Sequence, residues 1–239
     1  MLKIKSDISG LFNFLTIIIL IFVLGAIFIS SNAHGKIKCG GPFNFFISDI
    51  KKTSVSMGYS VDLVNDFFSS AEIDPEVLKA DQSQTIFRKS FFEFSNAVIS
   101  PHRLQNAAIN KRRYKQTFSK IKHQYGVPKE ILLAFWALET DFGLFQGDYN
   151  TLNALLTLSH DCRRPELFLP QVFGALELFK QNKFHPRATK GAWAGEIGML
   201  QMLPLDLLEN GIDGDGDGEV DITSSPIDAL YSMAEKLTS

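Results

Sequence analysis

A single glutamate, Glu139, follows a strongly apolar segment and is the first candidate for chemistry. Residues 131–138 are apolar on every face of a helix, and Phe135 and Trp136 lie one turn before the glutamate. A carboxyl group beside a buried aromatic surface loses solvation in its charged form, so its pKa rises and it can hold a proton near neutral pH. Glu139 is therefore a candidate general acid. A capping or ion-paired glutamate is the alternative, since perturbed carboxyl groups are also structural.

Glycoside hydrolysis would require a second carboxyl group. Hydrolases place two of them across the scissile bond, roughly 5–5.5 Å apart for retention and roughly 6.5–9.5 Å apart for inversion. Asp141 points away from Glu139 if the helix continues, and Glu196 lies in a glycine-flanked stretch whose position the sequence leaves open. One carboxyl group is enough if it protonates the leaving oxygen and then, as a carboxylate, takes a proton from a hydroxyl of the substrate.

An acidic loop at 213–221 indicates a second kind of chemistry, the binding of Ca²⁺. Its ligands would be the side chains of Asp213, Asp215, Asp217 and Asp221 and the backbone carbonyl of Glu219. Their order follows an EF-hand loop, and Ca²⁺ prefers several oxygen ligands. Position twelve is Ser224 instead of a bidentate glutamate, so we expect weak binding, with a Kd of roughly 10⁻⁴–10⁻³ M. An Asp-Gly turn without an ion is the alternative, and in both cases the loop is expected to be structural.

The first 33 residues predict export from the cytoplasm. Two lysines precede a run at 14–29 that carries no charge. Its length lies between that of a typical signal peptide core and the roughly 20 residues that span a bilayer. Small residues at 31–33 favour cleavage before His34, and an uncleaved membrane anchor is the alternative. Both interpretations deliver 34–239 across the membrane, in contact with it only through an uncleaved leader.

Two cysteines, Cys39 and Cys162, follow the leader. Disulfides persist in exported proteins, so we expect these residues to form one bridge. It would close a loop of well over a hundred residues and contribute about 2–4 kcal/mol to stability. Two buried free thiols are the alternative.

Helices are expected to position these groups. The 239 residues are 45% hydrophobic and 21% charged, which favours a globular chain, with 34–239 forming one mainly α unit. A net charge of −2 argues against a nucleic-acid partner held by a general positive field. The basic run 111–113 is expected to be a solvated face, with contact to an anionic polymer as the alternative. Apolar spacing predicts no strand and helices at 43–56, 60–68, 74–79, 83–99 and 101–122, with the apolar stripe of 83–99 facing inward.

Several motifs together resemble one enzyme family. They lie at 125–131, 137–143, 150–155, 191–198 with Gln201 and Pro204, and 213–218. In this order they are similar to the membrane-bound lytic murein transglycosylase B family, glycoside hydrolase family 103, over about residues 40–237. Residues 161–168 resemble its alphaproteobacterial members. The resemblance implies a lysozyme-like, mainly α fold with an EF-hand-like loop that holds a structural Ca²⁺, and no organic cofactor.

The resemblance also implies a reaction and a substrate. Members cleave the β-1,4 bond between N-acetylmuramic acid and N-acetylglucosamine in peptidoglycan glycan strands without water, leaving a 1,6-anhydromuramic end. Glu139 matches the family acid/base. Gln201 matches a glutamine that contacts the glycan, where an amide can both donate and accept hydrogen bonds; helix capping is its alternative. Trp193 could stack on a sugar, although packing in the core is equally compatible with its position.

The chain departs from the family pattern at several positions. Met202 and Leu207 stand where the family generally has Phe and a nearby Tyr, and Lys236 replaces a Tyr that would line the cleft. The chain is also shorter than its family at the carboxyl end, so we expect a C-terminally truncated catalytic domain. A non-catalytic peptidoglycan-binding protein of the cell wall is therefore the alternative function, and a hydrolytic muramidase is the third.

Overall fold

Helices make up most of this computed structural model, which describes residues 37–83 and 90–239. The predicted leader at 1–33 lies outside the described residues. Within the described ranges, no helix combines the length and the apolar character needed to cross a membrane. Residues 37–239 form one unit of the chain.

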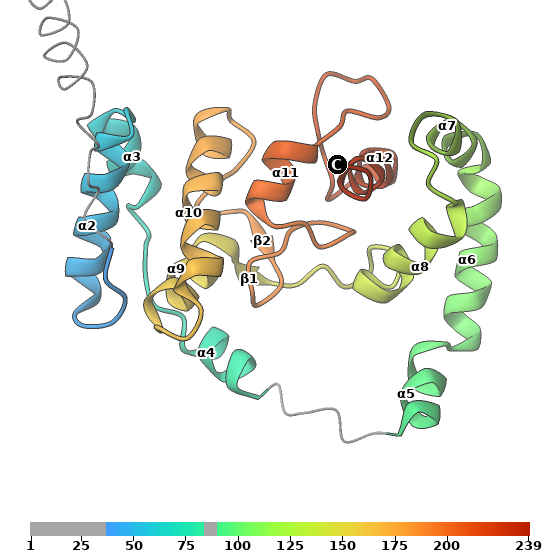
Figure 1. Ribbon diagram of the computed structural model, residues 1–239, viewed down its shortest axis with the longest axis horizontal. Helices are drawn as coiled ribbons and strands as arrows, with labels where there is room; N and C mark the ends of the chain where they lie inside the picture. The colour runs from blue at the N-terminus through green and yellow to red at the C-terminus, as the bar shows by residue number, and fades with distance from the viewer. Residues whose placement is uncertain (1–36, 84–89) are drawn as a thin grey trace, which may run out of the picture. The chain divides into compact units, whose positions relative to one another are not determined.

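The helices follow one another along the chain with one small strand pair between them (Figure 1). The helices are α2 (Phe43–Ser56), α3 (Val61–Phe67), α4 (Pro75–Gln82), α5 (Phe91–Val98), α6 (Pro101–Arg113), α7 (Lys115–Tyr125), α8 (Lys129–Thr140), α9 (Thr151–His160), α10 (Pro165–Lys180), α11 (Pro204–Asn210) and α12 (Pro226–Lys236). Strands β1 (Tyr149–Asn150) and β2 (Lys190–Gly191) pair antiparallel, with Tyr149 opposite Gly191. The prediction of no strand was wrong for this ladder, which is too short to show alternation in the sequence.

The helix boundaries confirm part of the sequence prediction. Helix α2 has the predicted bounds, and α4 runs three residues further than expected, to Gln82. The single helix predicted at 101–122 is two helices, α6 and α7, which meet at Tyr114. The helix predicted from residue 83 begins instead at Phe91, because Ser90 and Glu93 form a capping box. Part of that prediction, 84–89, lies outside the described residues.

Burial corrects two of the predictions. The apolar stripe at 83–99 does not face inward at Phe91, which is 76% exposed, and Phe94 is also exposed. In α8, Trp136 is buried, whereas Ile131 and Leu138 are about half exposed, at 45% and 52%. An apolar side chain can be buried, but its type alone does not show that it is. Whether it is buried depends on which elements pack over its face of the helix.

Among the described helices α9 is the best buried, since every residue from 151 to 159 is buried. It packs against α10, and α10 packs against α11. Gly174 permits the second contact, because a Cβ at this position would lie 2.9 Å from Leu205 Cδ2. Strand β1 packs against α9, and the loop at 191–203 leaves the β1–β2 ladder at the end of β2 (Figure 1).

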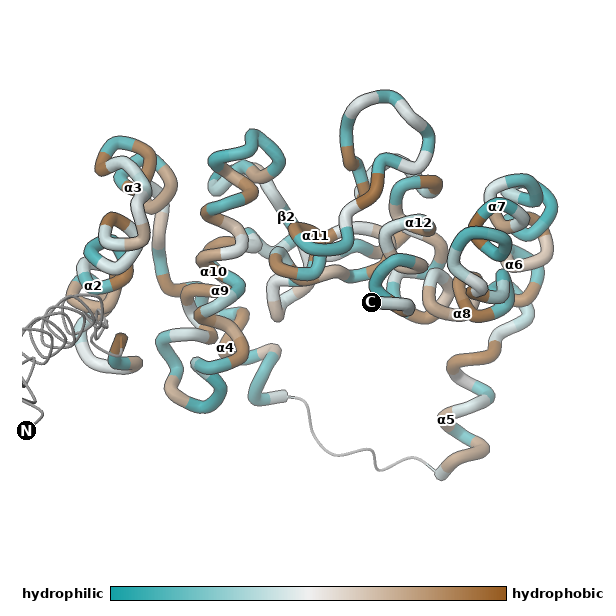
Figure 2. The backbone as a smooth tube through the Cα atoms, turned by 45° about the horizontal axis from the view of Figure 1, so that its top comes forward, coloured by the Kyte–Doolittle hydropathy of each residue, from teal (hydrophilic) through white to brown (hydrophobic). Residues whose placement is uncertain are grey.

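Two peripheral features relate to the sequence predictions. The structure joins Cys39 and Cys162 by a disulfide, which attaches the segment before α2 to the turn after α9. Next to this disulfide, Gly40 N–H donates to His160 O over 2.8 Å. The basic run 111–113 is exposed, and α6 and α7 are coloured largely hydrophilic in Figure 2. Solvent therefore reaches this basic face.

Candidate active site

Glu139 is the second-last residue of α8, where the backbone turns sharply. Asp141 and Phe142 adopt left-handed conformations, with φ of 51° and 63°. Phe142 N–H donates to Trp136 O over 3.0 Å, which closes the last turn. The helix therefore ends at Thr140, three residues before Gly143.

The carboxyl group of Glu139 is partly desolvated. The residue as a whole is exposed, so it is less sheltered than its sequence context predicts. Partial burial nevertheless raises its pKa, and the positive charge of Lys236 opposes that shift. The environment favours the protonated acid, while a nearby cation favours the carboxylate.

Buried Thr140 attaches the end of α8 to the loop at 191–203. Its Oγ1 donates to Met199 O over 2.6 Å and accepts from Gly143 N–H over 2.9 Å. The residue next to Glu139 is thus bonded to the loop that carries Glu196 and Gln201. The sequence does not predict this contact, because nothing in the residues around Thr140 indicates which distant segment it bonds to.

Glu196 lies in a tightly folded part of that loop. Ala192 N–H donates to Glu196 O over 2.9 Å, and Ile197 and Met202 exchange backbone hydrogen bonds of 2.8 and 2.9 Å. Burial raises the pKa of Glu196, and the charge of Glu139 raises it further. The structure therefore brings into electrostatic contact two carboxyl groups whose relative position the sequence left open.

Asp141 belongs to a different set of contacts. Its Oδ1 lies 3.6 Å from Arg103 Nε and its Oδ2 lies 3.7 Å from His102 Nδ1. Both partners come from α6. Asp141 thus pairs with basic residues of a neighbouring helix, so it is a weaker candidate than Glu196 for the second carboxyl group.

Gln201 and Trp193 lie in the loop that faces the end of α8. Gln201 has a φ of 50°, and its Nε2 donates to Gly198 O over 2.8 Å and to Gln146 O over 3.3 Å. These two bonds engage the amide hydrogens and leave the amide oxygen for a ligand. Trp193 is half-buried and packs against the core, as its alternative interpretation required.

Lys236, at the departure from the family pattern, is held by an acidic residue. Its Nζ lies 2.5 Å from Asp206 Oδ2, which also accepts from Leu203 N–H over 3.2 Å. Helix α12, which ends at Lys236, packs on both α8 and α11. The ammonium group is therefore fixed near the end of α8, where it acts on Glu139.

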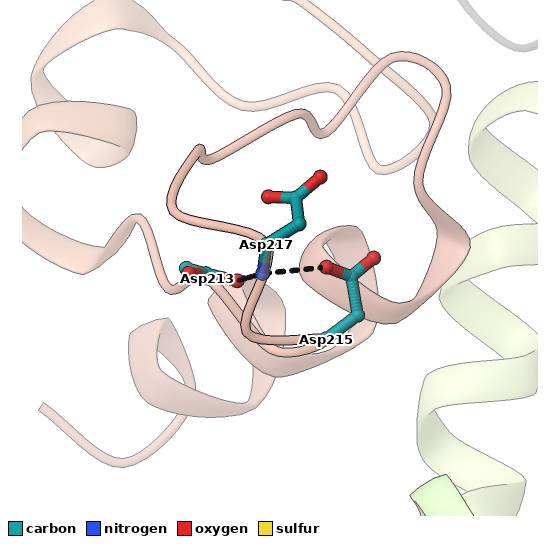
Figure 3. Close-up of side chains that lie close together, drawn as sticks. All are labelled: Asp213, Asp215 and Asp217. Atoms are coloured by element: carbon teal, nitrogen blue, oxygen red, sulfur yellow. Dashed lines mark hydrogen bonds between the residues drawn. The ribbon is translucent and has the colours of Figure 1, made fainter.

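The acidic loop brings together three of its four predicted side-chain ligands. The carboxylate oxygens of Asp213, Asp215 and Asp217 lie within 4.8 Å of one another (Figure 3). Asp221 lies outside this group and accepts from Thr223 N–H and Ser224 N–H, both over 2.9 Å. Glu219 was predicted through its backbone carbonyl, and its side chain lies outside the group as well. Three convergent carboxylates fit a hard cation such as Ca²⁺.

Asp228, which the sequence analysis missed, supports this loop from beneath. The residue is 1% exposed, and its carboxylate accepts from the N–H groups of Gly214, Asp215 and Asp221 over 2.9, 3.3 and 2.9 Å. The sequence feature that could have indicated its role is an acidic residue at a position of α12 that faces the core. Its carboxylate accepts hydrogen bonds from loop N–H groups that have no backbone acceptor within the loop.

The comparison with protein families now decides the identity. Residues 42–239 match the family model described as Transglycosylase SLT domain. The chain belongs to this family. The SLT domain therefore includes Glu139, the 191–203 loop and the acidic loop.

Known SLT-domain relatives agree in sequence and fold. Membrane-bound lytic murein transglycosylase B of Escherichia coli (strain K12) is 30% identical over 146 residues, 61% of this chain and 40% of the relative. SltB3 of Pseudomonas aeruginosa, solved in complex with NAG-NAM-pentapeptide, superposes with a TM-score of 0.76 at 27% identity, over 83% of this chain and 53% of that chain. Escherichia coli Slt35 in complex with calcium superposes with a TM-score of 0.73 at 25% identity, over 88% of this chain and 68% of that chain.

These likenesses confirm the family resemblance and the lysozyme-like, mainly α fold. The described chain spans only part of its relatives, 40% of the curated protein and 53% of SltB3.

Proposed function

We propose that this SLT domain is a periplasmic lytic transglycosylase that cleaves the β-1,4 bond between N-acetylmuramic acid and N-acetylglucosamine in peptidoglycan. The position and environment of Glu139 carry the proposal: a partly desolvated carboxyl group with a raised pKa ends α8 in a chain of this family. The solved complex of SltB3 with NAG-NAM-pentapeptide supports the substrate class.

Glu139 would act twice in one turnover. As an acid it donates its proton to the glycosidic oxygen, which leaves with the bonding electrons as the bond to C1 breaks. As a carboxylate it then removes the proton of the muramyl C6 hydroxyl, whose oxygen bonds to C1. The sugar cation between these steps would be stabilised by the N-acetyl group of the substrate. The product is a 1,6-anhydromuramic end, and Glu139 is protonated again.

The surroundings of Glu139 suit both steps. Partial desolvation favours the proton that the first step needs, and Lys236 stabilises the carboxylate that the second step needs. Because Lys236 is fixed by Asp206, its charge stays in place between the two steps. Gln201 and Trp193 would contact the glycan beside this acid.

The acidic loop would hold a structural Ca²⁺ through Asp213, Asp215 and Asp217. The convergence of these carboxylates and the calcium complex of Slt35 support this assignment. When bound, the ion would neutralise three like charges and fix the turn before α12. The loop would therefore act on stability, with no part in proton transfer.

A peptidoglycan-binding protein without turnover is the second candidate. Lys236, in place of the Tyr that the resemblance implies, favours it, because the cleft wall then differs from that of the family. Purified sacculi distinguish the two functions. An enzyme releases soluble 1,6-anhydromuropeptides that disappear with Glu139→Gln, whereas a binder sediments with the sacculi and releases none.

The products also separate transglycosylation from hydrolysis. A muramidase would give reducing muramic ends that incorporate ¹⁸O from labelled water. A transglycosylase gives anhydro ends without the label, and mass spectrometry resolves the two. Parallel digests with and without added calcium show whether turnover depends on the loop.

A further inference from the structure

A basic groove between α6, α7 and the start of α8 has no part in the mechanism above. It encloses about 740 Å³. The charged residues that line it are Lys111, Arg112, Lys115, Lys122, Lys129 and Glu130. Five cations and one carboxylate therefore surround a hollow to which the proposed reaction assigns no ligand.

The sequence concentrates positive charge around this basic groove. Residues 94–129 contain eight of the chain's 24 Lys and Arg and neither Asp nor Glu, so the rest of the chain holds 16 basic and 26 acidic residues. Like charges in one run repel each other, and here the fold of α6, α7 and α8 gathers them around one hollow. The groove therefore carries a local positive field on a chain that is otherwise acidic.

A carboxylate of the protein itself shows how the groove holds an anion. Glu130 Oε1 lies 3.8 Å from Lys111 Nζ of α6 and 3.2 Å from Lys129 Nζ of α8. Two helices thus present ammonium groups to one oxygen. Within the described part of the chain, the side chains of Arg112 and Lys115 are exposed and have no hydrogen bond or ion pair. These two cations are available to a carboxylate from outside.

The shape and the floor of the groove favour an extended peptide as its ligand. Phe118 is only 2% exposed, and Ala108 and Pro128 line the groove beside it, so the floor is apolar. Lys122 Nζ donates to Gly126 O over 2.5 Å, which fixes one ammonium group of the rim. The carboxylates of a peptide would meet the basic rim and its aliphatic carbons would meet the floor. A flat bilayer would meet the rim alone.

We propose that the basic groove binds the acidic stem peptides of peptidoglycan while the glycan strand occupies the active site. This inference rests on the proposed function and names a second contact for its substrate. Helix α8 runs from Lys129 in the groove to Glu139, about 15 Å along its axis. An extended chain of five residues spans about 17 Å, so a peptide on a muramyl unit beside Glu139 is long enough to reach the groove.

The active site and the groove also share α12 as a neighbour. Tyr125, at the end of α7, packs on Tyr231 of α12 with ring centres 6.1 Å apart. Helix α12 ends at Lys236, whose charge acts on Glu139. One helix therefore borders both the α7 wall of the groove and the candidate acid, which keeps the two sites at a fixed separation.

Binding of soluble disaccharides tests the groove without turnover. GlcNAc-MurNAc and GlcNAc-MurNAc-pentapeptide both lack the bond that the proposed reaction cleaves. We expect the native protein to bind the pentapeptide form about tenfold more tightly, and Arg112→Glu/Lys115→Glu to lose this difference, because two ion pairs become repulsions. In the native protein the difference should also shrink as salt is added, since exposed ion pairs are screened.

The chain offers a matched control for the change in charge. Arg113→Glu/Lys120→Glu reverses one cation on each of the same two helices, at exposed positions that do not line the groove. This variant should keep the preference for the pentapeptide form within about twofold. Both double variants should unfold at the native temperature, because all four side chains are exposed.

Turnover provides a second measurement of the same contact. Sacculi are compared with glycan strands from which an amidase has removed the peptides. At limiting substrate we expect Arg112→Glu/Lys115→Glu to release anhydro products from sacculi about tenfold more slowly than the native protein, with a smaller loss on the stripped strands. An equal loss on both substrates would contradict the assignment of the groove to the peptide.

Three results of the binding experiment overturn the proposal. The first is equal affinity of the native protein for the two disaccharides. The second is loss of the peptide preference in Arg113→Glu/Lys120→Glu as well, because a general positive field would then be acting. The third is sedimentation with vesicles of anionic lipid that depends on Arg112 and Lys115 while the peptide preference does not, which would assign the groove to a membrane surface.

The two hypotheses fail separately in this design. Native protein that releases no anhydro products overturns the proposed reaction, whereas the two disaccharide affinities still decide the ligand of the groove. Release of anhydro products together with equal affinity for the two disaccharides leaves the reaction in place and overturns the inference about the groove alone.

Discussion

The carboxyl groups at the end of α8 and those of the acidic loop differ in what surrounds them. In the loop, Asp213 accepts from Gly216 N–H and Gly218 N–H over 2.6 and 2.9 Å, and Asp217 accepts from Glu219 N–H over 2.9 Å. At the active site, Glu139 and Glu196 are partly desolvated, and both pKa values are raised. Backbone donors and solvent suit carboxylates that act as cation ligands, whereas desolvation suits carboxyl groups that carry protons.

Each region also depends on one buried polar residue for its shape. Thr140 bonds the end of α8 to the 191–203 loop, and Asp228 gathers three backbone N–H groups beneath the acidic loop. The first contact positions proton chemistry, and the second supports the fold. Substitutions in the two regions should therefore change different measurements.

Removing the candidate acid should have the largest effect and should act on turnover. Glu139→Gln is expected to lower kcat by about 10²–10⁴-fold, because proton transfer by a placed group contributes about that much. Its stability relative to the native protein should increase as the pH rises above the ordinary pKa of a glutamate, because native Glu139 must ionise while partly desolvated, which raises its pKa in the folded state. Product release and thermal unfolding across pH check the two parts. A variant that remains active would remove Glu139 from the mechanism.

Removing the support of the acidic loop should act on stability. Asp228→Ala leaves three backbone N–H groups without their acceptor and is expected to cost about 3 kcal/mol. Asp228→Asn keeps one acceptor oxygen and should cost less. Urea unfolding measures both, and an unchanged unfolding midpoint for the alanine variant would contradict the role given to Asp228.

Calcium should stabilise the protein through the loop alone. With a Kd of roughly 10⁻⁴–10⁻³ M, about 10 mM calcium would add about 1–3 kcal/mol to the free energy of unfolding. Asp213→Asn should abolish this gain, and the same concentration of magnesium serves as the ion control. Equal stabilisation of the native protein and the variant would place the ion elsewhere.

The smallest effect should come from the cation beside the acid. Lys236→Met is expected to raise the pKa of Glu139 further, because Lys236 lowers it in the native protein. The alkaline limb of kcat/KM should then move to higher pH, because Glu139 keeps its catalytic proton over a wider range. Lys236→Arg keeps the charge and should leave that limb close to its native position. An unmoved limb in Lys236→Met would show that Lys236 does not act on Glu139.

Local patterns were enough to predict several features. The bounds of α2 and the raised pKa of Glu139 follow from neighbouring residues. The Asp213, Asp215 and Asp217 cluster also follows from spacing, since a short loop brings its alternate residues together. These features depend on interactions within a few residues, which a sequence displays directly.

Other features depend on contacts between distant segments. The exposure of Phe91 and the support by Asp228 were missed, because each depends on which element packs opposite. The pairing of Glu139 with Glu196 is the clearest case. The sequence alone determined that a carboxyl group ends an apolar helix. Only the tertiary structure decided that a second carboxyl group, Glu196, 57 positions later, lies near enough for the charge of Glu139 to raise its pKa. Burial and Coulomb energy depend on distance in space, which the sequence does not give.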